Sequence, residues 1–116
     1  MPHKLTNTTD LTRDAVDANA VAWKLEEVPR GLDSNVIRLP AGGSIGEHVG
    51  GEVDVLVHVI AGSGRIGSGD IDMPVTAGDL LWLPRQSHRS ITAGDDGLDY
   101  LTVHTHREPT LTIGMP

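Results

Sequence analysis

The sequence has no cysteine and no phenylalanine, and its aromatic residues are one tyrosine and two tryptophans among 116 residues. Without cysteine there are no disulfide bonds, no thiolate ligands and no cysteine nucleophile. With so few aromatic rings, valine, leucine and isoleucine must fill most of the core. A chain of this length is expected to form a single domain over residues 1–116.

Basic residues and long apolar segments are also scarce. Nine lysines and arginines stand against 16 acids, which gives a net charge of −7. This balance disfavours nucleic acid, whose phosphates would repel the chain. No apolar run is long enough to cross a membrane, and the N-terminal residues are too polar for a signal peptide. We therefore expect no nucleic-acid or membrane partner and a cytoplasmic location.

Glycine and proline are frequent, with 14 and seven residues, and they separate short apolar segments. This punctuation is typical of short strands joined by tight turns. Strands are predicted near residues 21–28, 36–39, 45–49, 53–61, 65–67, 71–75, 80–83, 88–92, 100–105 and 111–113. No segment predicts a convincing helix. About nine to eleven strands indicate an all-β sandwich or barrel, and the polar residues 1–15 predict a poorly ordered N-terminal arm.

The segment over residues 42–64, GGSIGEHVGGEVDVLVHVIAGSG, carries the first candidate site. His48 is followed by Glu52 and Asp54, and His58 interrupts an otherwise apolar strand. A histidine and carboxylates held on rigid strands suit metal binding or acid–base chemistry. The same residues also suit a barrel in which they have no chemical role.

This segment resembles the first motif of the cupin family. That motif runs Gly, five residues, His-x-His, three or four residues, Glu, six residues, Gly. Gly42 and His48 fit it, and Gly62 fits its last position. Gly50 stands at the second histidine. The carboxylate position falls on Val55 with the four-residue gap; with the three-residue gap it falls on Asp54, and the final glycine is then one residue late.

A later segment resembles the second cupin motif, which runs Gly, five residues, Pro-x-Gly, two residues, His, three residues, Asn. Gly78 and Pro84 fit it, whereas Gln86 replaces the glycine. Arg89 replaces the histidine, and a histidine comes one residue early as His88. The two motifs and the strands between them cover roughly half of the chain. The resemblance implies a small single-domain cupin, an all-β double-stranded β-helix of the jelly-roll type, with altered metal-ligand motifs.

Many cupins hold a divalent transition metal, so the resemblance implies a site for Zn, Fe, Mn or Ni. His48 stands at the first ligand position of the first motif. The set would be completed from Asp54, with Glu52 as the alternative carboxylate, His88 and His104. His104 would supply the imidazole that the first motif lacks.

Four further residues are expected to line the ligand pocket: His58, Trp82, Arg89 and Tyr100. His58 fits a buried core position as well as a ligand position. Neighbouring residues of a strand point to opposite faces, so either His88 or Arg89 points inward unless a bulge intervenes. An inward Arg89 would bind a carboxylate or phosphate rather than complete a metal site.

Two functions therefore stay open. In the first, a small cupin binds a divalent metal and a small molecule, as a metal-dependent enzyme. In the second, a metal-free cupin binds a small ligand, an anion where Arg89 faces inward, as a sensor, carrier or metal-independent enzyme. The apolar strand near residues 55–60 and an exposed sheet edge also predict a homodimer, as is common among cupins.

Overall fold

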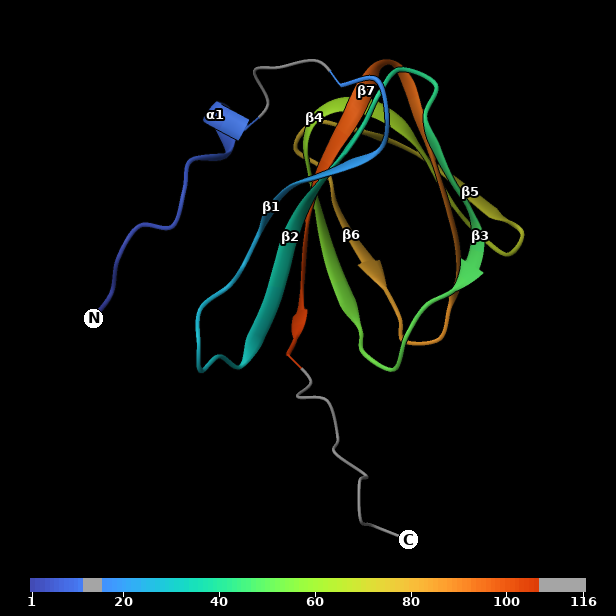
Figure 1. The fold of residues 1–116 in the computed structure, drawn as a ribbon. Helices are drawn as coiled ribbons and strands as arrows, with labels where there is room; N and C mark the ends of the chain where they lie inside the picture. The colour runs from blue at the N-terminus through green and yellow to red at the C-terminus, as the bar shows by residue number, and fades with distance from the viewer. Residues whose placement is uncertain (12–15, 107–116) are drawn as a thin grey trace, which may run out of the picture.

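The computed structural model describes residues 1–11 and 16–106, which form one short helix and seven strands (Figure 1). The helix is α1 (Thr8–Leu11). The strands are β1 (Ala20–Lys24), β2 (Leu32–Leu39), β3 (Ser44–Val49), β4 (Val55–Ser68), β5 (Ile71–Thr76), β6 (Leu80–Leu83) and β7 (His88–Thr105). The predicted strand at residues 111–113 lies outside the described residues.

The strands pair antiparallel, and the long strands β4 and β7 belong to both walls of a barrel. The first half of β4 and the second half of β7 form one wall with β1, β2 and β6. The other halves form the second wall with β3 and β5. Figure 1 shows β1, β2 and β6 on one side of the barrel and β3 and β5 on the other.

Glycines allow β4 and β7 to bend from one wall to the other. The pairing of the two strands shifts between Val59 and Ala61 and again between Gly62 and Gly64. Gly62 and Gly97 both have φ of +78°, a left-handed conformation that is costly for any residue with a Cβ atom. A Cβ atom on Gly62 would also lie 2.1 Å from the carbonyl oxygen of Gly97. The bends therefore need glycine for both backbone conformation and space.

The all-β prediction is confirmed, whereas the predicted number of strands is wrong. Residues 62–64 and 93–97 were expected to be turns between separate strands, but they lie inside β4 and β7. Each of these long strands was therefore counted as two. The sequence also gave no convincing helix, yet one helical turn forms at α1, where the Asn7 side chain accepts a hydrogen bond from the Thr9 amide at 2.9 Å.

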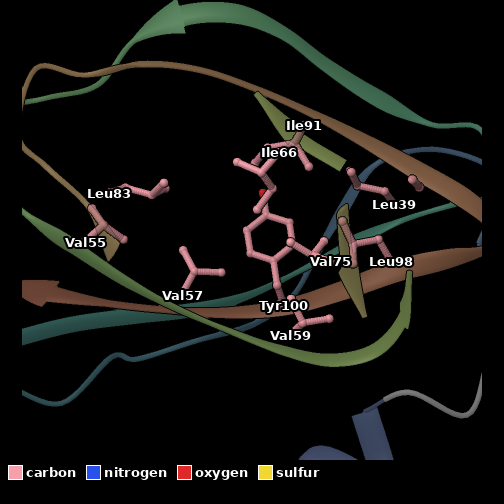
Figure 2. Packing of buried hydrophobic residues seen from close by; sticks show 11 residues of the cluster. Leu39, Val55, Val57, Val59, Ile66, Val75, Leu83, Ile91, Leu98 and Tyr100 are labelled. Carbon is pink, nitrogen blue, oxygen red and sulfur yellow. The ribbon is translucent and has the colours of Figure 1, made fainter. Parts of the chain in front are cut away.

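The core lies between the two walls and consists almost entirely of aliphatic side chains (Figure 2). Along β4, Val55, Val57 and Val59 are buried, whereas Leu56 and His58 are exposed. This alternation is the period of two that a half-buried strand requires. Tyr100 is the aromatic member of the cluster, and its ring crosses the core toward the second wall (Figure 2).

Within residues 1–11 and 16–106, no helix has the length and apolar character needed to span a membrane.

Candidate functional site

A cavity of about 220 Å³ lies inside the barrel. Isoleucine, valine and leucine side chains from both walls form much of its lining. Six residues with polar groups also line it, namely Asn35, His48, Arg89, Tyr100, Thr102 and His104. The cavity therefore combines an apolar body with a few polar groups, as small-molecule sites commonly do.

Arg89 enters the cavity from β7. It is directly opposite His48 in the pairing of β3 with β7, so the two side chains are neighbours on one face of the sheet. Arg89 is only 8% exposed. Its Nε donates to the Ser87 hydroxyl at 3.1 Å, and its Nη2 donates to the Pro84 carbonyl oxygen at 2.8 Å. Burial lowers the pKa of Arg89, but a guanidinium remains charged in proteins.

The guanidinium of Arg89 rests on the backbone of Gly50. A Cβ atom on Gly50 would lie 2.3 Å from the guanidinium carbon, so no residue with a side chain fits at position 50 while Arg89 holds this conformation. Gly50 is also the position of the second histidine in the first cupin motif. The arginine from the second motif thus takes up space beside the first motif that an imidazole would need.

His88 points away from the cavity. It faces Val49 in the pairing of β3 with β7, and its Nδ1 lies 3.3 Å from a Glu47 carboxylate oxygen on the exposed surface. No bulge restores the register between His88 and Arg89, so the arginine points inward and the histidine outward. Both belong to the second cupin motif, and the slip of one residue decides which of them lines the cavity.

His48 and His104 line the cavity from β3 and from the end of β7, and each uses its Nδ1 for a backbone carbonyl oxygen. The Nδ1 of His48 is 3.0 Å from the Gly46 carbonyl oxygen, and the Nδ1 of His104 is 2.9 Å from the Thr105 carbonyl oxygen. A carbonyl oxygen only accepts, so both Nδ1 atoms carry the proton. In the neutral rings, Nε2 is then a hydrogen-bond acceptor.

Tyr100 and Thr102 complete the polar lining from the second half of β7. Thr102 donates from its hydroxyl to the Asn35 side-chain oxygen at 2.5 Å. Tyr100 is 4% exposed, and burial raises its pKa to about 12. The Tyr100 hydroxyl has no hydrogen-bond partner among the described residues. The hydroxyl oxygen is not among the fully buried unpaired atoms of the described residues, so it stays open to a partner in the cavity that Tyr100 lines.

The predicted carboxylates and two of the predicted pocket residues lie outside the barrel. Asp54, Glu52 and Trp82 line a larger open groove of about 810 Å³ on the outer surface. Asp54 accepts from the Arg85 backbone amide at 2.9 Å and from its Nη2 at 3.1 Å, and the side-chain hydrogen bond from Arg85 lowers the pKa of Asp54. His58 is exposed because it shares the outward face of β4 with Leu56.

No protein-family model matches the chain, and no curated protein matches it in sequence. Solved structures do match. A cupin superfamily protein from Desulfitobacterium hafniense superposes with a TM-score of 0.74 at 15% identity, over 92% of this chain and 94% of that chain. The chain therefore has the cupin fold, the double-stranded β-helix.

Two other structural neighbours carry names that refer to particular proteins. KdgF from Halomonas sp. has a TM-score of 0.69 at 13% identity, over 84% of this chain and 86% of that chain. A predicted oxalate decarboxylase from Thermotoga maritima has a TM-score of 0.59 at 25% identity, over 65% of this chain and 66% of that chain. The present chain thus spans just under two thirds of the Thermotoga protein.

The cupin family implies a divalent metal, and the residues of this barrel can be tested against that requirement. A first-row metal needs two or three neutral imidazoles and a carboxylate that converge on one point. The cavity offers the imidazoles of His48 and His104, but no carboxylate lines it in the described part of the chain, and Arg89 adds a fixed positive charge. No group of three histidine, aspartate or glutamate side chains among the described residues could hold an ion. The residues present do not fit a divalent metal.

Sequence reasoning missed two polar residues of the cavity, Asn35 and Thr102, and the role of a third residue, Gly50. Asn35 lines the cavity from β2, and its signal is a polar residue just before the apolar stretch at 36–37. Gly50 was recognised as the loss of a ligand, but its role in making room for Arg89 was not. The signal that could have revealed this role is a joint change: Gly50 replaces the second histidine of the first motif, and Arg89 replaces the histidine of the second motif.

Proposed function

We propose that this cupin binds a small organic anion inside its barrel, with the Arg89 guanidinium as the anchor. The observation that carries this proposal is a buried cation without a buried counter-charge. The hydrogen-bond acceptors of Arg89 are a hydroxyl and backbone carbonyl oxygens, and no described carboxylate lies within ion-pair distance of it.

An anionic ligand would supply the missing charge. A buried charge is costly unless it is paired and hydrogen-bonded. Arg89 uses Nε and Nη2 for the protein, whereas Nη1 has no acceptor among the described residues. Charge-assisted hydrogen bonds between a guanidinium and a carboxylate are among the strongest that proteins make.

The size and lining of the cavity favour an organic anion over a bare inorganic one. A volume of 220 Å³ corresponds to roughly seven water molecules at about 30 Å³ each. Much of the lining is aliphatic, which suits a short hydrocarbon body attached to the charged group. Straight-chain carboxylates of about five carbons are therefore suitable probes.

The proposal is tested by titration calorimetry with pentanoate and with pentanamide, its neutral counterpart of similar size. Pentanoate is expected to bind and pentanamide to bind much more weakly. In Arg89→Gln, pentanoate binding should weaken by about thirtyfold or more, because loss of one partner of a buried charge pair typically costs 2–5 kcal/mol. Arg85→Gln is the matched control, since Arg85 pairs with Asp54 outside the cavity. Its affinity for pentanoate should remain unchanged.

A parallel thermal-shift series separates this proposal from a metal-dependent cupin. The purified protein is heated with pentanoate, or with chloride salts of Zn²⁺, Mn²⁺ or Ni²⁺, because a ligand that binds the folded state raises the melting temperature. Stabilisation by pentanoate that disappears in Arg89→Gln supports the proposal. Stabilisation by a metal that His48→Ala abolishes, with no response to pentanoate, would overturn it.

A further inference from the structure

The Tyr100 hydroxyl is a second polar group in the cavity that the anion anchor does not use. Tyr100 is only 4% exposed and lines the cavity. Its hydroxyl has no hydrogen-bond partner among the described residues. Its ring extends from β7 toward Ile66 and Ile91 (Figure 2). The hydroxyl oxygen is not fully enclosed by protein atoms, so a ligand atom in the cavity could accept the hydrogen bond that no described residue accepts.

We propose that the ligand is a short oxo-carboxylate, whose carboxylate binds Arg89 and whose carbonyl oxygen, several bonds away, accepts a hydrogen bond from the Tyr100 hydroxyl. This inference rests on the proposed function, because it takes the anion at Arg89 as one of two points of recognition. Tyr100 would then be the residue that selects among anions of similar size.

The surroundings of the hydroxyl favour a neutral carbonyl oxygen as its partner. The ring is packed among aliphatic residues such as Ile66 and Ile91 (Figure 2). A carboxylate moved into such surroundings would lose its hydration, which is far more costly for a charged group than for a carbonyl. The carboxylate therefore belongs at Arg89 and the neutral oxygen at Tyr100.

Arg89 and Tyr100 enter the cavity from the two walls of the barrel, through the first and the second half of β7. Arg89 and Ile91 both point into the cavity from the first half of β7, and two residues along a strand span roughly 6.6 Å. Tyr100 reaches toward Ile91 from the opposite wall (Figure 2). We propose that a carbonyl separated from the carboxylate by two methylene groups, as in 4-oxopentanoate, reaches Tyr100, and 2-oxopentanoate provides the comparison in which the carbonyl is next to the carboxylate.

The other polar groups of the cavity are less suitable for this role. The Thr102 hydroxyl already donates to Asn35. The two histidines use Nδ1 for backbone carbonyl oxygens, so their neutral rings offer an acceptor rather than a donor to a carbonyl oxygen. The Asn35 amide nitrogen lies in a residue that also lines the neighbouring cavity near Lys24 and is less buried than Tyr100.

The test is calorimetric binding of pentanoate, 2-oxopentanoate and 4-oxopentanoate to the wild-type protein and to Tyr100→Phe. The wild type should bind 4-oxopentanoate about fivefold to tenfold more tightly than pentanoate, as expected for one buried hydrogen bond. Tyr100→Phe removes only the hydroxyl oxygen, so it should abolish this preference and leave pentanoate affinity within about twofold. Pentanoate binding also reports that the variant is folded.

Asn35→Leu, combined with Thr102→Val so that the Thr102 hydroxyl is not released as a new donor, provides a second variant, because it removes the competing donors and leaves Tyr100 in place. The preference for 4-oxopentanoate should persist in this double variant, and its loss there would overturn the assignment to Tyr100. Equal affinity of the wild type for pentanoate and 4-oxopentanoate would also overturn it, as would equal weakening of both ligands by Tyr100→Phe. A preference for 2-oxopentanoate that Tyr100→Phe leaves intact would do the same. In these cases Arg89-dependent binding of pentanoate would still support the proposed function, whereas failure of all three acids to bind would overturn both.

Discussion

Tyr100 is an internal probe of the barrel, because it is the only tyrosine in the chain. Burial raises its pKa to about 12, above the ordinary value of about 10. The folded chain therefore keeps the phenol proton over a range of pH in which the unfolded chain loses it. The resulting contribution to stability is fully present below pH 10 and is lost as the pH rises from about 10 to about 12; it amounts to roughly 2–3 kcal/mol.

Alkaline titration of the phenolate absorbance checks this prediction. The folded protein should titrate near pH 12, and the urea-unfolded protein should titrate near pH 10. Circular dichroism at each pH shows whether the barrel is intact, and Tyr100→Phe provides the blank. A midpoint near pH 10 in a protein that retains its β-sheet signal would contradict the buried position of the hydroxyl.

Residue-scale prediction from sequence depended on strand register. The alternation rule correctly stated that His88 and Arg89 must point in opposite directions, but the sequence alone could not choose between them, because a bulge would reverse the answer. The same limit applied to Asp54, whose direction could not be followed through the turn at Gly50 and Gly51. The structure places Arg89 inside and Asp54 outside.

Gln86 shows how a family pattern can carry physical information even where the residue differs. It stands at the position of the glycine in the second cupin motif and has a φ of +58°. A left-handed backbone at this position explains why the family pattern has glycine there. The position of the turn could be predicted from the sequence, whereas the left-handed conformation of Gln86 is known only from the structure.

At the scale of the element, the bends of β4 and β7 are the features that most depend on particular residues. Gly62 combines a positive φ with an approach to the Gly97 carbonyl oxygen that leaves no room for Cβ. Gly42 has a φ of +72° but nothing within 4 Å of a Cβ atom, and Gly46, in β3, has neither restriction. These three glycines separate the cost of backbone conformation from the cost of a steric clash.

Alanine substitution of the three glycines should therefore give a graded loss of stability. Gly46→Ala should be neutral or stabilising by up to about 1 kcal/mol, and Gly42→Ala should cost about 1–2 kcal/mol for the left-handed backbone. Gly62→Ala should cost more than Gly42→Ala, because the two strands must also move apart. Urea unfolding followed by circular dichroism measures the three values. Equal stability of Gly62→Ala and Gly42→Ala would show that the close approach has no energetic weight.

The long strands also explain why element boundaries were harder to predict than fold class. Alternating valines and glycine punctuation were enough to indicate an all-β barrel. Glycines at a bend and glycines at a turn look alike in sequence, because both serve a positive φ or a close approach. Whether the ladder of hydrogen bonds continues through them depends on neighbours that are distant in the chain, such as the pairing of residues 62 and 98.

At the scale of the whole molecule, one outer face of the sheet is unusually apolar. Leu80 and Trp82 on β6 are 67% and 60% exposed. In the pairing of β6 with β4, Leu80 is opposite His58 and Trp82 is opposite Leu56. On the other side of β4, Leu56 is opposite Val103 of β7. Contiguous apolar side chains on one sheet face commonly mark an interaction site. His58, which the sequence suggested as a pocket residue, belongs to this outer face instead.

We propose that this outer face joins two copies of the chain in a homodimer. Each copy carries a net charge of −7, so electrostatic repulsion opposes association and the apolar face must provide the attraction. Added salt screens repulsion between like-charged chains and does not weaken apolar contacts. The dimer is therefore expected to become more stable as the salt concentration rises, which is the opposite of what an interface built on ion pairs would show.

Sedimentation velocity at low and high salt tests the homodimer. The wild-type chain should sediment as a dimer, with a larger dimer fraction at high salt, and Leu80→Glu should sediment as a monomer because it places a charge in the centre of the contact. Ile71→Glu is the matched control, since Ile71 is 61% exposed but lies on β5 in the other wall, and this variant should remain dimeric. Leu80 is so exposed in the single chain that its replacement should leave the fold intact, so loss of the dimer would report on the contact itself. A wild-type protein that stays monomeric at both salt concentrations, or a Leu80→Glu variant that stays dimeric, would show that this face does not join two copies.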